Sequence, residues 1–108
     1  MSINVSLLKS CCETPGISGY EQPIRAFIES QVKGIADELY TDHMGNLITV
    51  LKGKSSDKKI MAFAHMDEIG FMVKAIDENG FIRIQTIGGF DPKTLTAQRV
   101  TVHGKKDI

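Results

Sequence analysis

The chain has 108 residues, with 13 lysines and arginines against 13 aspartates and glutamates, so its net charge is zero. It lacks the basic surface of a nucleic-acid-binding protein, and no apolar run reaches the ~18 residues that cross a bilayer. We therefore expect neither nucleic acid nor membrane as a partner. The N-terminus lacks the pattern of a secretory signal, and two adjacent cysteines cannot form a disulfide framework, which predicts a cytoplasmic protein.

Two helices are expected in the first 35 residues. The first carries Leu7, Leu8, Cys11 and Cys12 at helical spacing and ends at residues 14–19 (TPGISG), a loop rich in turn-forming residues. A second helix is expected after this loop. Pro23 is compatible with it, because proline is tolerated in the first turn of a helix. Its apolar face is predicted to enter the core and consists of Ile24, Phe27, Ile28, Val32 and Ile35.

Strand-like patterns begin near residue 37. Residues 38–41 and 47–51 predict a hairpin whose turn places His43 in solvent, and the lysine-rich residues 52–59 predict a solvated loop. After Gly70, strands at 71–76 and 81–85 are expected to form a second hairpin around Asn79-Gly80. A last strand is expected at residues 98–103.

The most informative stretch is the apolar run at residues 60–64 and the polar residues that follow it. The run predicts a buried strand, which would place His65 at the carboxyl edge of a sheet, where α/β folds keep their sites. Residues two apart share a face of a strand, so Asp67 can reach His65. A carboxylate that orients a histidine suits a metal ligand or a catalytic dyad, and equally a histidine that is merely buried and hydrogen-bonded.

Glu68 follows Asp67 directly and is expected to face the opposite side of the strand. We therefore expect it to serve as a helper or salt-bridge residue and not as the base of the same site. The same geometry disfavours a glycosidase, which needs two carboxyl groups that converge on one bond.

The pattern of elements changes near Gly70, from helices with strands to consecutive hairpins. This predicts two domains, residues 1–69 and 70–108. About forty residues are too few to bury a β core of their own. We therefore expect the chain to be the N-terminal portion of a longer protein.

Four segments together resemble the glutamyl-aminopeptidase and deblocking-aminopeptidase family of dinuclear metal peptidases, also called cellulase-M-like. These are TPGISGYE at residues 14–21, DHMGNLI at 42–48, AHMDEIGFMV at 64–73 and DENGFIRIQTIGG at 77–89. The resemblance covers essentially the whole chain, and the ten-residue AHMDEIGFMV match is the most specific. Thr96-Ala97 departs from the family, which more often has a glycine before the position of Gln98.

The resemblance implies an α/β zinc-peptidase-like catalytic domain at residues 1–69, followed by the start of an inserted β-rich, barrel-like dimerisation domain at 70–108. It implies that His65 binds one of two divalent metal ions and that Asp67 orients His65 in a supporting catalytic role. The other ligands and the general-base glutamate would lie beyond residue 108, so the 108-residue chain alone is expected to be inactive. Zinc suits such a site, and cobalt or manganese also fits.

The implied reaction is metal-assisted hydrolysis of the N-terminal peptide bond of peptide substrates. The family also implies homo-oligomers in which dimers assemble into a dodecamer. Two other functions stay open: a non-catalytic assembly or binding module that uses exposed sheet edges, and an endoglucanase, as relatives have been labelled.

Overall fold

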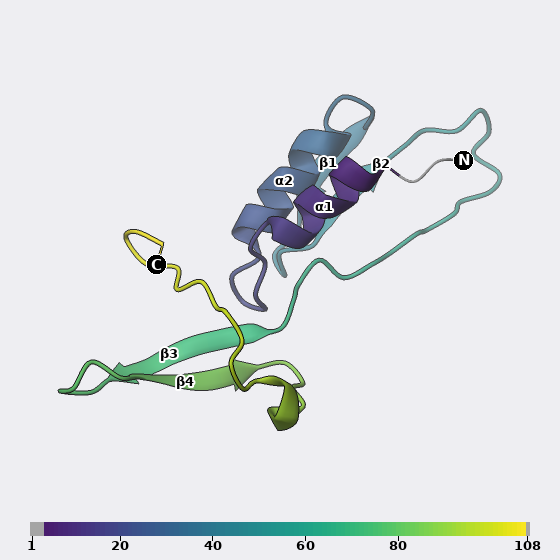
Figure 1. Cartoon of the computed structure of the whole chain (residues 1–108). Coiled ribbons are helices and arrows are strands. Elements are labelled where there is room, and N and C mark those ends of the chain that lie inside the picture. The colour runs from purple at the N-terminus through teal and green to yellow at the C-terminus, as the bar shows by residue number, and fades with distance from the viewer. Residues whose placement is uncertain (1–3, 108) are drawn as a thin grey trace. The chain divides into compact units, whose positions relative to one another are not determined.

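The computed structural model describes residues 4–107 and contains the expected mixture of helices and strands (Figure 1). The chain divides into two units, one that ends at Glu68 and one that begins at Ile69. None of the helices in the described residues is long and apolar enough to cross a membrane.

The two predicted helices of the first unit are present. Helix α1 spans Val5–Glu13 and begins at Asn4, whose side chain accepts a hydrogen bond from the backbone N–H of Leu7 at 3.0 Å. Helix α2 spans Gln22–Val32 and has a proline in its first turn. Its residue Ile24 is 4% exposed and forms the apolar centre of the described chain.

Ile35 was expected to extend the apolar face of α2, and this expectation is wrong. Helix α2 ends at Val32, and the chain turns at residues 33–35. The Ile35 side chain is 67% exposed. Gly34 favours this turn, because glycine has a low propensity for helix interiors.

The first predicted hairpin is confirmed. Strand β1, Glu38–Thr41, pairs antiparallel with β2, Leu47–Val50. In the turn, the Asp42 carboxylate accepts backbone hydrogen bonds from Met44 and Asn46, each at 2.9 Å, and Gly45 has φ +89°. Arg25 of α2 donates to the carbonyl oxygen of Gly45 at 3.2 Å, so the turn is tied to the helix.

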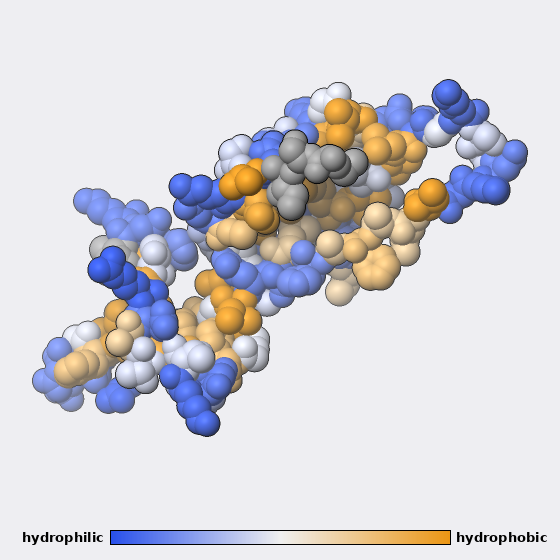
Figure 2. All heavy atoms as spheres, turned by 45° about the vertical axis from the view of Figure 1, so that its right-hand side comes forward, coloured by the Kyte–Doolittle hydropathy of each residue, from blue (hydrophilic) through white to orange (hydrophobic). Residues whose placement is uncertain are grey.

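The prediction of a buried strand at residues 60–64 is wrong for the described chain. These residues form no regular element and belong to the long loop between β2 and β3 (Figure 1). Ile60, Met61 and Phe63 are 97%, 82% and 89% exposed, and apolar residues are visible on the surface in Figure 2. A buried strand needs a neighbour for its backbone hydrogen bonds, and no strand within residues 4–107 pairs with this segment. The lysine-rich residues 52–59 are exposed, as predicted.

The second unit contains the second predicted hairpin. Strand β3, Gly70–Ile76, pairs antiparallel with β4, Ile82–Ile87, and the register shifts between Val73 and Ala75. The left-handed residue of the turn is Gly80, with φ +84°, and not Asn79. The loop therefore resembles the longer hairpin loops that place a glycine in this conformation.

The ring of Phe71 in β3 stacks on that of Phe90, which follows β4, with the centroids 4.7 Å apart. A short 3-10 helix then spans Pro92–Thr94. The strand predicted at residues 98–103 is absent. The alternating pattern there has no strand to pair with in the described part of this unit, so alternation alone does not produce a sheet.

Candidate functional site

The side chains of His65 and Asp67 contact each other. The ring nitrogen Nδ1 of His65 lies 3.0 Å from Oδ1 of Asp67 and 3.0 Å from the Asp67 backbone carbonyl oxygen. The expected contact is therefore present, although the segment that carries it is an extended loop and not a strand.

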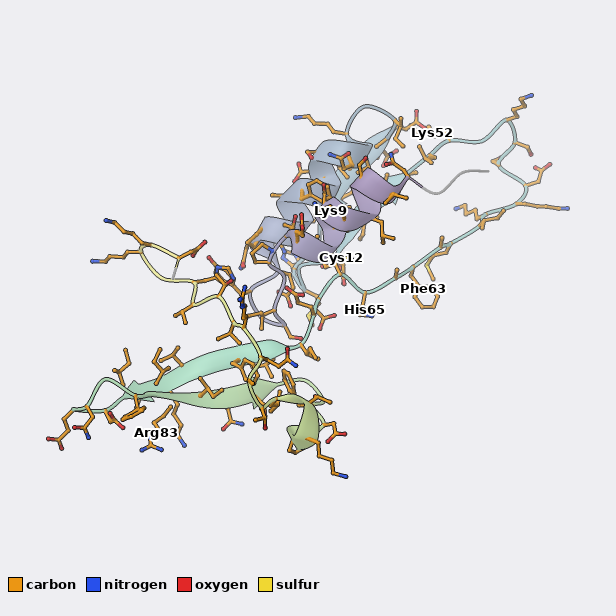
Figure 3. The ribbon with its side chains drawn as sticks, viewed as in Figure 1. Lys9, Cys12, Lys52, Phe63, His65 and Arg83 are labelled. Carbon is orange, nitrogen blue, oxygen red and sulfur yellow. The ribbon has the colours of Figure 1, made fainter. Side chains whose placement is uncertain are left out.

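These two contacts determine which ring nitrogen of a neutral His65 carries the proton. A carboxylate oxygen and a carbonyl oxygen are both acceptors, so Nδ1 must be the donor. The lone pair of the neutral imidazole is then on Nε2. The His65 side chain is 85% exposed, and Figure 3 shows it on the same extended stretch as Phe63, with both side chains on one side of the backbone. His65 thus presents an accessible ligand atom.

Asp67 is held from a second direction by the loop after α1. The Ser18 hydroxyl donates to Oδ2 of Asp67 at 2.5 Å, while Oδ1 faces His65. Hydrogen bonds from Ser18 first, and from His65 second, lower the pKa of the Asp67 carboxyl group below its usual value. Asp67 is therefore an ionised acceptor at neutral pH, which favours the Nδ1–H form of His65.

Glu68 fixes the same loop to the His65 segment. Its backbone N–H donates to the carbonyl oxygen of Gly16 at 2.8 Å, and its Oε1 accepts from the backbone N–H of Gly16 at 3.1 Å. Ile17 and Glu68 also form an isolated parallel bridge. The Glu68 carboxylate accepts from a backbone amide and forms no ion pair within the described residues, so the expected salt bridge is not seen there and the helper role stays a prediction.

Two of these contributors were not singled out from the sequence. Gly16 and Ser18 lie in the TPGISG loop, which reads by composition as a plain turn. Their partners Glu68 and Asp67 follow about fifty positions later, and Ser18 and Asp67 are 49 residues apart. No local pattern links such distant positions; only the family-like SGYE segment marked this loop.

A cavity of about 170 Å³ lies beside His65 within the first unit. It is formed by the His65 segment, the start of α2 and the turn of the first hairpin, and its lining residues are Glu21, Met44, Gly45, Asn46, Ala64, His65, Met66 and Asp67. A small ligand group or ion therefore has access to the imidazole.

The described residues do not contain a complete set of metal ligands. Within residues 4–107, no group of three or more histidine, cysteine, aspartate or glutamate side chains is arranged to hold a metal ion. His43 is exposed in its turn, as expected, and Cys11 and Cys12 are free thiols on α1. A catalytic zinc ion normally has three protein ligands, so His65 fits as one of them and needs others.

Known proteins with related sequences and structures are aminopeptidases for the most part. Lysyl aminopeptidase of Pyrococcus furiosus is 43% identical over 105 residues, which cover 96% of this chain and 30% of that protein. An aminopeptidase structure from Desulfurococcus kamchatkensis matches with a TM-score of 0.88 and 37% identity, over 94% of this chain and 28% of the other.

Two further structures are similar. A Thermotoga maritima protein named endoglucanase matches with a TM-score of 0.77 and 45% identity, over 82% of this chain and 28% of its own. The structure of PhTET1-12s, described as a dodecamer, matches with a TM-score of 0.73 and 40% identity, over 84% of this chain and 27% of its own. The chain thus spans less than a third of the length of each of these proteins.

A family model supports the same relationship. The model for M42 glutamyl aminopeptidases matches residues 45–108, which is more than half of the chain and includes His65, Asp67 and Glu68. The chain belongs to the M42 glutamyl aminopeptidase family.

Proposed function

We propose that this chain supplies one part of the active site of a metal-dependent aminopeptidase that removes N-terminal residues from peptides. In this proposal Nε2 of His65 is a metal ligand, and Asp67 holds the imidazole in place. The observation that carries the proposal is the pair of acceptor oxygens 3.0 Å from Nδ1, which places the lone pair of a neutral imidazole on Nε2 of an exposed side chain in a member of this family.

When bound, the divalent ions would supply Lewis-acid activation of water and of the scissile carbonyl. The chain's own residues have a supporting part. His65 donates a lone pair, and ionised Asp67 fixes the tautomer and the orientation of the ring. We propose two ions, with zinc preferred by a histidine and carboxylate site and cobalt or manganese as alternatives.

The division of the chain at Glu68 and Ile69 supports two different roles. We propose that residues 1–69 belong to the α/β catalytic domain and that residues 70–108 begin an inserted β-rich, barrel-like dimerisation domain. The similarity to PhTET1-12s supports a homo-oligomer, up to a dodecamer. A cytoplasmic location stays a prediction from the sequence.

An endoglucanase is the second candidate, because one similar structure bears that name. Both carboxylates of the motif already have other partners: Asp67 contacts Ser18 and His65, and Glu68 contacts the backbone of Gly16. Neither is left free for a glycosidic bond, which disfavours this candidate. The third candidate, a non-catalytic module, predicts no bound metal at all.

The test is to replace His65 with alanine in the intact protein and to measure metal content by mass spectrometry. We expect the loss of at least one metal ion per chain and of aminoacyl-anilide hydrolysis. His43→Ala is the matched control, because His43 is exposed and does not line the cavity. Unchanged metal content in His65→Ala would refute the ligand assignment. Hydrolysis of a cellulosic substrate that survives a chelator would favour the endoglucanase.

A further inference from the structure

We infer that Ser18 is a positioning residue for His65 that acts through the Asp67 carboxylate. The inference rests on the metal-binding role proposed for His65. Ser18 Oγ donates to Oδ2 of Asp67, and Oδ1 of the same carboxylate accepts from Nδ1 of His65. Contacts on both oxygens fix the rotation of the carboxylate about χ2. Without such contacts an aspartate side chain has a broad distribution of χ2 values.

The backbone on both sides of Ser18 is also held in place. The N–H of Tyr20 donates to the carbonyl oxygen of Ile17 at 2.7 Å, which closes a turn with Ser18 and Gly19 at its centre. Gly19 has φ +88°, as the second central position of a type II turn requires. Ile17 forms the bridge to Glu68. The position of the Ser18 hydroxyl is therefore set by the loop and not by its rotamer alone.

The approach of this loop also leaves no spare space behind it. A Cβ at Gly16 would lie 2.6 Å from Cγ2 of Ile24 and 3.2 Å from the carbonyl oxygen of Met66. The loop is thus packed between α2 and the His65 segment. This packing places the Ser18 hydroxyl next to Oδ2 of Asp67, while His65 contacts Oδ1.

The expected consequence of removing the hydroxyl is a change of tautomer at His65. Without Ser18, the Asp67 carboxylate can rotate toward solvent, and its hold on Nδ1–H weakens. The Asp67 carbonyl oxygen, 3.0 Å from Nδ1, remains as an acceptor, so only a part of the neutral imidazole moves its proton to Nε2. That part cannot bind a metal ion through Nε2. Ser18 therefore acts on the ligand atom without touching it.

The first measurement reads the tautomer directly in the metal-free, intact protein. Histidine labelled with ¹⁵N is observed by solid-state NMR at about pH 8, well above the reference pKa of a histidine side chain in peptides. The His65 signals are assigned by their absence in His65→Gln. We expect Ser18→Ala to raise the Nε2–H population of His65, and Ser18→Thr, which keeps a hydroxyl, to restore the original state. The matched control is Ser30→Ala, which removes a serine hydrogen bond inside α2 and is expected to change nothing.

The second measurement is zinc affinity by competition with a chromophoric chelator. We expect about a tenfold loss for Ser18→Ala, as for other residues that orient metal ligands, and recovery in Ser18→Thr. Ser18→Cys, which keeps the volume and donates only weakly, replaces the alanine variant if that variant does not fold. An unchanged His65 tautomer in a folded variant without the hydroxyl overturns the inference. Because the tautomer is read without metal, this result is independent of whether His65→Ala loses metal, which tests the proposed function.

Discussion

Asp42 and Asp67 are two aspartates whose pKa values are both lowered, for related reasons and with different consequences. The pKa of Asp42 is lowered chiefly by a hydrogen bond from the Asn46 side chain, and that of Asp67 chiefly by one from Ser18. All the hydrogen bonds that lower the pKa of Asp42 come from within four residues, in its own turn. Asp67 instead joins a loop 49 positions earlier to a neighbouring histidine.

The difference shows that a lowered pKa does not by itself indicate a functional site. The Asp42 carboxylate accepts hydrogen bonds from residues of its own hairpin turn, and none of these bonds orients a titratable or metal-binding side chain. Asp67 positions an imidazole whose other nitrogen is free and exposed. The identity of the partner, and not the size of the pKa shift, distinguishes a structural carboxylate from one that prepares a ligand.

The largest expected effect is a difference in zinc affinity between variants of the two aspartates. Asp67→Asn in the intact protein removes the negative charge that favours Nδ1–H of His65, so we expect zinc affinity to fall about 10- to 100-fold. Asp42→Asn should leave zinc affinity unchanged, because the hydrogen bonds of Asp42 within residues 4–107 all lie in its own turn and none reaches His65. Chelator competition on both variants measures the difference. Equal losses of zinc affinity in the two variants would contradict the conclusion that Asp67, and not Asp42, positions His65.

The loop that carries Ser18 to Asp67 can be displaced through Gly16. Gly16→Ala places a Cβ 2.6 Å from a side-chain atom of Ile24, so we expect a loss of about 1–3 kcal/mol in the free energy of unfolding. Zinc affinity should fall as well, because Ser18 moves with the loop. Urea unfolding and chelator competition measure the two effects.

Gly34→Ala is the control for this substitution. A Cβ at Gly34 would meet nothing within 4 Å, and its φ is not positive, so the variant should be neutral or more stable by up to ~1 kcal/mol. Similar destabilisation by both variants would mean that the close approach at Gly16 is not what matters.

The same contrast between local and distant partners explains what could be predicted from the sequence. Both hairpins were predictable, because an aspartate and a glycine three positions later close each turn; Asp42 and Asp77 bind their turns in the same way. The contact of Asp67 with His65 was predictable from a spacing of two. The part played by Ser18 was not, because nothing in a sequence shows which of many loop serines meets a carboxylate 49 residues away.

The residues that were wrongly predicted as strands make the same point. The apolar run at 60–64 and the alternating run at 98–103 have the composition of strands, and neither finds a partner among residues 4–107. Composition measures how well a segment would fit a sheet. Composition does not show whether a neighbouring strand is present to pair with the segment.

A smaller effect concerns the acid dependence of stability. Because the pKa of Asp42 is lower in the folded chain than its usual 3.8, the folded state holds fewer protons than the unfolded state in this range. Its contribution to stability is present above pH 3.8 and is lost as the pH falls through the lowered value. Asp42→Asn should therefore be less stable than the parent chain at pH 6, and this difference should shrink toward pH 3. Urea unfolding across this range measures it, and a difference that does not change with pH would contradict the assigned cause.

The smallest expected effect is at Phe63, whose side chain is 89% exposed in a loop without a pairing partner. In the 108-residue chain, Phe63→Ser should change the free energy of unfolding by less than about 0.5 kcal/mol. In the intact protein, a strand from outside residues 4–107 that covers this segment would raise the cost toward the ~3–5 kcal/mol typical of truncating a buried phenylalanine. Urea unfolding of both forms makes the comparison. A large loss in the short chain would mean that Phe63 already has a packing partner there, and a negligible loss in both would remove residues 60–64 from any buried sheet.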